Sequence, residues 1–132
     1  RANPLVRLVE HLPREAFVAL LKRLARPSAV GFRGFIIGNS SAGLIEAAAL
    51  GLPAINVGPR QAGRERGANV IDVPVSANPD RLSTRLRRAI LEAIDLQPGA
   101  AHPYGDGRAG PRIAALLAST NPAELIRKRN AY

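Results

Sequence analysis

Hydrophobic and polar positions along the 132-residue chain follow two periods, one typical of helices and one typical of strands. Apolar residues three or four positions apart predict helices over 13–25 and 78–95. Their expected buried stripes are Phe17, Leu20, Leu21 and Leu24 in the first, and Leu82, Leu86, Ile90 and Ile94 in the second. Short runs of β-prone residues predict strands over 34–38, 53–57 and 68–73.

Three further helices are predicted, one between the first two strands and two after the long helix. Small and apolar residues predict a helix over 41–50 and a shorter one over 111–118, and Asn121 precedes a final one. Asn78 followed by Pro79 is typical of a capped helix start. Because helices and strands alternate, the chain is predicted to be an α/β domain, with a parallel sheet flanked by helices.

The turn that follows Phe35-Ile36-Ile37 carries the most informative polar residues. It has the sequence Gly38-Asn39-Ser40-Ser41-Ala42-Gly43-Leu44-Ile45-Glu46. The first N–H groups of a helix lack internal partners and lie at the positive end of its dipole, so a phosphate is the expected ligand of such a turn. Glu46, within a run of small apolar residues, is either exposed or reserved for a ligand hydroxyl. The alternative is that Ser40 or Ser41 only caps the helix.

A second polar loop follows the next predicted strand, with the sequence Gly58-Pro59-Arg60-Gln61-Ala62-Gly63-Arg64-Glu65-Arg66-Gly67. Parallel strands end at the same edge of a sheet, so this loop is expected beside the serine turn. A planar guanidinium suits a phosphate well, which makes Arg60 a candidate ligand. Arg64 and Arg66 either share that role or lie on a solvated loop face.

Several segments of the sequence resemble a known family. The segments 38–47 and 51–73, and Pro-Tyr-Gly-Asp-Gly-Arg-Ala at 103–109, look like the hydrolysing UDP-N-acetylglucosamine 2-epimerases, and 12–17 is similar to the helix that precedes their site. The resemblance implies a glycosyltransferase-B fold with the UDP-sugar between two Rossmann-like halves. This chain would be most of the C-terminal half, a single nucleotide-binding domain over 1–132.

The resemblance also implies roles for the candidate residues. Ser40 and Ser41 would contact the diphosphate, Glu46 the ribose hydroxyls, and Arg60 the nucleotide, with Asn39 and Gly43 shaping the turn. The implied reaction eliminates UDP from UDP-N-acetylglucosamine and adds water with inversion at C2, which releases N-acetylmannosamine for sialic-acid or related biosynthesis. Its catalytic carboxylates and a histidine would come from the N-terminal half, so no catalytic residue, metal or cofactor is expected in this chain.

The other titratable and polar features add little to this interpretation. His11 and His102 both lie in loops without a paired base, so neither is assigned a role. Tyr104 is either a turn residue or, as the resemblance suggests, part of the nucleotide cleft.

Length and composition fit one domain of a longer protein. The chain has no Met, and its first residues have the character of a loop, so it is expected to be a fragment whose partner is the N-terminal domain of the same enzyme. The absence of Cys excludes disulfides and thiol chemistry. No segment resembles a membrane span or a signal peptide. Together with the resemblance, which implies a UDP-sugar ligand, these features lead us to expect a cytoplasmic homo-oligomer with no membrane partner.

The net charge of +9 does not change this view. All the basic residues except Lys22 and Lys128 are Arg and they are dispersed, while aromatic residues make up only 4% of the chain. So few aromatic side chains provide little surface for base stacking, which argues against nucleic acid as a partner.

Two points stay open. Residues 26–34 are longer than the brief turn of the family pattern, which makes the geometry of the following strand less certain. The same architecture is also compatible with a UDP-sugar glycosyltransferase or with a non-catalytic interaction domain, although the loop at 60–64 looks like that of the epimerases.

Overall fold

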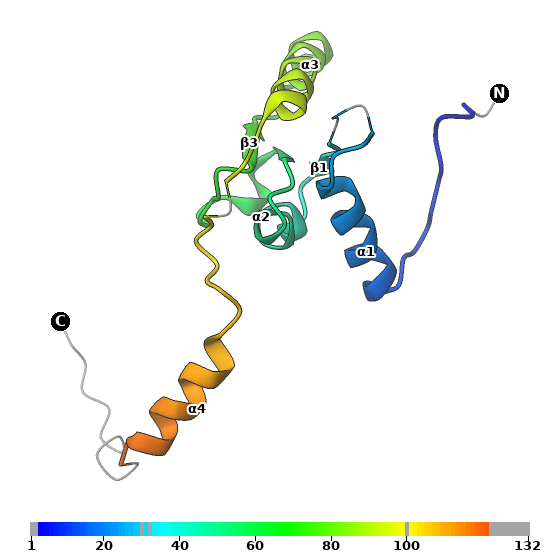
Figure 1. The fold of residues 1–132 in the computed structure, drawn as a ribbon. Coiled ribbons are helices and arrows are strands. Elements are labelled where there is room, and N and C mark those ends of the chain that lie inside the picture. Colours follow the sequence, from blue (N-terminus) through cyan, green and yellow to red (C-terminus); the bar gives the residue numbers. More distant parts are fainter. Residues whose placement is uncertain (1–2, 30, 32, 100, 122–132) are drawn as a thin grey trace.

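The structure is a computed structural model that describes residues 3–29, 31, 33–99 and 101–121. In chain order its elements are α1 (Arg14–Ala25), β1 (Ile36–Gly38), the 3-10 turn η1 (Ser41–Gly43), α2 (Glu46–Ala49), β2 (Ala54–Val57), the 3-10 turn η2 (Pro59–Gln61), β3 (Val70–Val73), α3 (Pro79–Asp95) and α4 (Ala109–Ser119). The strands form a parallel sheet in the order β1-β2-β3. The predicted fold class, a parallel sheet flanked by helices, is confirmed (Figure 1).

The central strand β2 divides the core into two halves. Because successive side chains of a strand point to opposite faces, Ala54 packs with α1 and α2, whereas Ile55 packs with α3. Both side chains are 1% exposed. The sheet is therefore the middle layer of three, as expected for parallel strands joined by helices.

Helix α3 follows its prediction closely. The Asn78 side chain accepts hydrogen bonds from the backbone N–H groups of Asp80 and Arg81, as predicted for a cap. The small residues Ala89 and Ala93 are the ones that become buried, because they allow the helix to approach the sheet. The predicted leucine and isoleucine stripe flanks them and is half-buried.

Helix α1 begins at Arg14, one residue after the predicted start, and one of its stripe residues was placed wrongly. Leu21 is buried, with Phe17 and Leu24 packed in the same cluster. Leu20 is 42% exposed. The contact with the sheet is narrow and follows the spacing of Phe17, Leu21 and Leu24, which leaves Leu20 at its margin.

The first strand is shorter and more exposed than predicted. The run 34–38 was expected to be a buried strand, but β1 covers only Ile36–Gly38, and Ile37 is 47% exposed. Helix α3 packs mainly over β2 and β3, so the face of β1 that carries Ile37 is left uncovered. The third strand also begins later than predicted, at Val70, because a turn from Gly67 to Val70 precedes it.

Gly34 explains how the long segment 26–34 returns to the sheet. Its N–H donates to the carbonyl oxygen of Leu24 at 2.8 Å. A Cβ at this position would lie 2.5 Å from Leu24 Cδ2 and 3.0 Å from Leu24 Cβ. A larger residue here would have to push the Leu24 side chain aside, so glycine favours this close return of the chain to the end of α1.

Helix α4 extends the predicted 111–118 helix by a few residues at its start and one at its end, and it stands away from the sheet (Figure 1). It has no buried residue, and Ile113, Leu116 and Leu117 are each more than half exposed. The final helix predicted to follow Asn121 lies outside the described residues. Within the described ranges, no helix is both long and apolar enough to cross a membrane.

The close approach at Gly34 leads to a stability prediction. Gly34→Ala should lower the free energy of unfolding by about 1–2 kcal/mol, because the new methyl group must displace Leu24 from the core. The urea midpoint measures this loss. Gly110→Ala is the control, because nothing lies within 4 Å of the position that its Cβ would take. Equal midpoints for the two variants would contradict the packing described here.

Candidate functional site

The two polar loops meet at the carboxyl edge of the sheet, as their positions after parallel strands predict. Arg60 Nη1 donates to the backbone carbonyl of Asn39 at 3.2 Å. Gln61 Nε2 donates to the same oxygen at 2.8 Å. The carbonyl of Asn39 therefore joins the turn after β1 to the loop after β2.

Gly58 makes this junction possible. It directly follows β2 and has φ +84° and ψ −178°, a backbone conformation that residues with a Cβ rarely adopt. The sharp change of direction starts η2 at the next residue and turns Arg60 and Gln61 back toward β1.

The prediction of one continuous helix over 41–50 is wrong, because the structure interrupts it. The structure has the three-residue turn η1 followed by the four-residue helix α2. In a continuous helix the Gly43 carbonyl would accept from the N–H four residues later. Instead it accepts a hydrogen bond from Asn69 Nδ2 at 3.1 Å, which competes with the helical pattern.

This interruption weakens the helix-dipole argument for a phosphate site, because the dipole depends on aligned peptide units. Ser40 is the cap of η1, and its Oγ accepts from the Ala42 N–H at 3.3 Å. The capping alternative thus describes Ser40 as it stands here. The Ser41 hydroxyl makes no hydrogen bond within the described residues.

Glu46 is the first residue of α2 and is held from α1. Its Oε1 lies 2.8 Å from Arg14 Nη1, and the Glu46 side chain is 26% exposed. The ion pair shows that the two helices begin close together. Helix α2, which joins β1 to β2, begins at the edge of the sheet where the turn and the Arg60 loop also lie. The structure brings Asn39 and Arg60 into contact. It places Ser40, Ser41 and Gly43 in the adjoining turn and Glu46 at the start of the helix that follows.

Buried amide side chains hold this edge together, and the sequence interpretation missed them. Asn69 is 2% exposed and donates to the carbonyl oxygens of Gly43 and Leu52, both at 3.1 Å. Gln61 is 4% exposed and Asn56 is 3% exposed. Asn56 lines a cavity of about 40 Å³ under the turn, large enough for one water molecule.

A row of hydrogen-bonded polar side chains, called the ladder below, crosses the sheet near its carboxyl edge and consists of Asn56, Asp72 and Arg66. Gly38, Asn56 and Asp72 are register partners on the three strands. Asn56 Nδ2 donates to Asp72 Oδ1 at 2.6 Å, and Arg66 Nε lies 2.6 Å from Asp72 Oδ2. A polar residue inside each of the two otherwise apolar strands was the signal in the sequence that could have identified this ladder.

Arg66 lies on the exposed face of its loop, but its side chain is held by the surrounding chain. Besides its ion pair it donates to the backbone carbonyls of Arg64 and Gln61. These contacts close the loop 58–67 onto β3. Tyr104 adds a further contact, because its hydroxyl donates to the Glu65 carbonyl at 2.6 Å.

The Asp72 carboxyl group has a lowered pKa. Partial burial opposes its ionisation, but hydrogen bonds from Arg66 and Asn56 and the charge of Arg66 outweigh that effect, so the pKa lies below its ordinary value of 3.8. Asp72 is thus a charged, hydrogen-bonded anchor for the loop under ordinary conditions.

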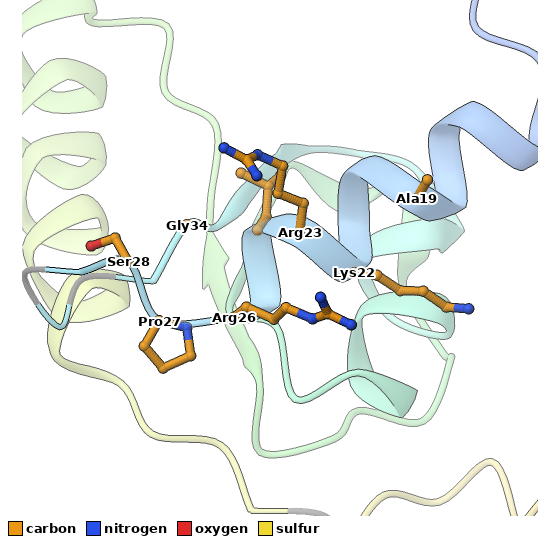
Figure 2. A pocket seen from close by; sticks show the side chains of 8 residues that line it. Ala19, Lys22, Arg23, Arg26, Pro27, Ser28 and Gly34 are labelled. Carbon is orange, nitrogen blue, oxygen red and sulfur yellow. The ribbon is translucent and has the colours of Figure 1, made fainter.

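A wider hollow than the cavity under the turn lies elsewhere. It has a volume of about 610 Å³ and surrounds the end of α1, where Lys22, Arg23 and Arg26 are exposed. Figure 2 shows Lys22 and Arg26 extending to one side and Arg23 to another, so the three cations do not converge on one anion. Among the described residues no group of three or more His, Cys, Asp or Glu side chains could hold a metal ion.

Comparison of the sequence with known proteins identifies its family. The sequence model described as UDP-N-acetylglucosamine 2-epimerase matches residues 1–118. The chain belongs to this family. The predicted resemblance is thereby confirmed.

Two relatives of this 2-epimerase family member are informative. A protein of Legionella pneumophila named UDP-N,N'-diacetylbacillosamine 2-epimerase (hydrolyzing) is 38% identical over 132 residues, which is 98% of this chain and 31% of that protein. Polysialic acid biosynthesis protein P7 of Escherichia coli is 63% identical over 43 residues, or 33% of this chain and 11% of that protein. The chain thus spans about a third or less of the length of these relatives.

The role of Asn69 can be tested by stability. Asn69→Ala should lower the free energy of unfolding by about 2 kcal/mol or more, because two buried carbonyl groups lose their donor. Asn78→Ala, which removes only the cap of α3, should cost about 1 kcal/mol. Urea unfolding of both variants is the measurement, and a smaller loss for Asn69→Ala than for Asn78→Ala would contradict the anchoring role.

The Asp72 pKa predicts an acid dependence. A carboxyl group whose pKa is lowered by folding stabilises the protein above its unfolded pKa, and that contribution disappears as the pH falls through the folded value. The stability advantage of the native chain over Asp72→Asn should therefore be constant at neutral pH and shrink below about pH 3.8. Urea unfolding at several pH values measures it. The control is Asp95→Asn at the end of α3. The prediction would be contradicted if the free energy of unfolding of Asp72→Asn changed with pH in parallel with that of the native chain.

Proposed function

We propose that this chain is the UDP-binding, C-terminal half of a hydrolysing UDP-N-acetylglucosamine 2-epimerase. The proposed enzyme converts UDP-N-acetylglucosamine to N-acetylmannosamine and UDP, by elimination of UDP followed by hydration with inversion at C2. Family membership supports the enzyme class. The observation that carries the binding role is the contact of Arg60 with the turn at Asn39, because it places a cation beside the predicted diphosphate site.

Each candidate residue has a task in this proposal. Arg60 uses Nη1 to hold Asn39. A guanidinium has five donors, so its remaining N–H groups can bind phosphate oxygens. The Ser41 hydroxyl donates to the diphosphate, while Asn39, Ser40 and Gly43 shape the turn. Glu46 accepts hydrogen bonds from the ribose hydroxyls.

The same contacts assist the chemistry without taking part in it. When the bond from C1 of the sugar to UDP breaks, negative charge develops on the leaving diphosphate. A cation already held in place stabilises that charge without reorganisation. The acid and base groups of the reaction are proposed to come from the N-terminal half, and this chain supplies no catalytic residue.

The sugar is the less defined part of the substrate. The Legionella relative is named for a UDP-diacetylbacillosamine and the Escherichia coli relative for polysialic acid biosynthesis. All the proposed contacts of this chain are to the nucleotide, so they are compatible with either sugar. We propose UDP-N-acetylglucosamine, with a role in sialic-acid or related biosynthesis.

The partner of this domain is proposed to be the N-terminal half of the same protein. The chain spans 31% of the Legionella relative, and α4 carries three apolar side chains that no described residue covers. A cytoplasmic homo-oligomer without a cofactor remains part of the proposal. Family membership favours an epimerase over a glycosyltransferase or a non-catalytic interaction domain.

Titration calorimetry of the purified chain tests the proposal. UDP and UDP-N-acetylglucosamine should bind with similar, weak affinity, whereas a single-stranded oligonucleotide should not bind at moderate salt. Arg60→Ala and Glu46→Ala should each weaken UDP binding roughly tenfold or more, because each removes hydrogen bonds to or from a charged group. Arg87→Ala, an exposed position on α3, is the matched control.

Two outcomes would contradict this function. One is tight binding of the oligonucleotide together with no binding of UDP. The other is release of N-acetylmannosamine by the isolated chain, which would show that it contains catalytic groups.

A further inference from the structure

Arg14 occupies a position that the function proposed above does not use. It is the first residue of α1, and its Nη1 lies 2.8 Å from Glu46 Oε1 at the start of α2. This is the one hydrogen bond of the Glu46 carboxylate among the described residues. The second carboxylate oxygen, Oε2, is left open to a ligand.

The distance between the two side chains is set by the core. Leu21 of α1 and Ala47 of α2 belong to one buried cluster and are 1% and 0% exposed, with Phe17 packed against them. Ala47 is the residue next to Glu46. Because both helices are fixed by this contact, Arg14 approaches Glu46 from a defined direction.

The pair is poorly suited to a role in stability alone. The Arg14 side chain is 69% exposed, and exposed ion pairs contribute little to folding. Its effect falls instead on the orientation of Glu46. A carboxylate held by one oxygen loses less rotamer freedom when its other oxygen accepts a hydrogen bond from a ligand.

We propose that Arg14 is a positioning residue that orients Glu46 toward the ribose, so that it sets the preference of the site for a ribonucleotide over a deoxyribonucleotide. This inference rests on the proposed function, in which Glu46 binds the ribose hydroxyls. Arg14 itself acts through Glu46.

The experiment compares UDP with 2′-deoxy-UDP by titration calorimetry on the full chain. The native chain should prefer UDP. Arg14→Ala should weaken UDP binding roughly threefold to tenfold and 2′-deoxy-UDP binding by a smaller factor, because the deoxynucleotide offers Glu46 one hydroxyl instead of two. The ratio of the two dissociation constants should therefore fall. Arg14→Lys should restore part of the ratio, because it keeps the charge within reach of Glu46.

The controls separate orientation from folding and from net charge. Arg23→Ala removes an exposed cation from the other end of α1 and should leave the ratio unchanged. The urea midpoint of Arg14→Ala should match that of the native chain. A purely structural role would shift this midpoint and would lower both affinities equally.

The remaining outcomes are decisive. A native chain that binds UDP and 2′-deoxy-UDP equally, or an Arg14→Ala variant with an unchanged ratio, would overturn the positioning role and leave the proposed function intact. A native chain that does not bind UDP would overturn the proposed function, and this inference with it.

Discussion

The carbonyl oxygen of Asn39 is the point on which the candidate site depends. It accepts hydrogen bonds from Gln61 Nε2 and from Arg60 Nη1, so one backbone atom joins the turn after β1 to the loop after β2. Gln61 is almost fully buried, so its hydrogen bond is shielded from water. The Arg60 guanidinium donates to the same oxygen from an exposed position. The parallel pairing of β1 with β2 brings both loops to one edge of the sheet, and these two bonds then hold them together.

The polar interior behind this edge has a cost in stability. Asn56, Gln61 and Asn69 are buried, and one side-chain oxygen of each has no hydrogen-bond partner within the described residues. Unpaired buried acceptors lower the stability of a fold. The ladder of Asn56, Asp72 and Arg66 offsets part of this cost with an ion pair and a short hydrogen bond.

The segments at both ends of the described chain expose more apolar side chains than the part that forms the sheet and its helices. Helices α1, α2 and α3 cover most of both faces of the sheet, whereas α4 exposes Ile113, Leu116 and Leu117, and the segment before α1 exposes Leu5 and Leu8. Apolar side chains in this number are unusual on a surface that meets only water. They agree with a chain that covers about a third of the length of its Legionella relative.

The sequence by itself determined the fold class, the family and the capped start of α3, because periodicity, turn residues and Asn78-Pro79 are local signals. It also predicted that Arg60 would lie beside the serine turn, since parallel strands end at one edge. Only the tertiary structure decided that the helix after Ser40 is interrupted, because the competing donor, Asn69, is distant in sequence. The same holds for the Arg14 contact with Glu46 and for the buried Gln61: each depends on a partner from another element, and no local pattern specifies it.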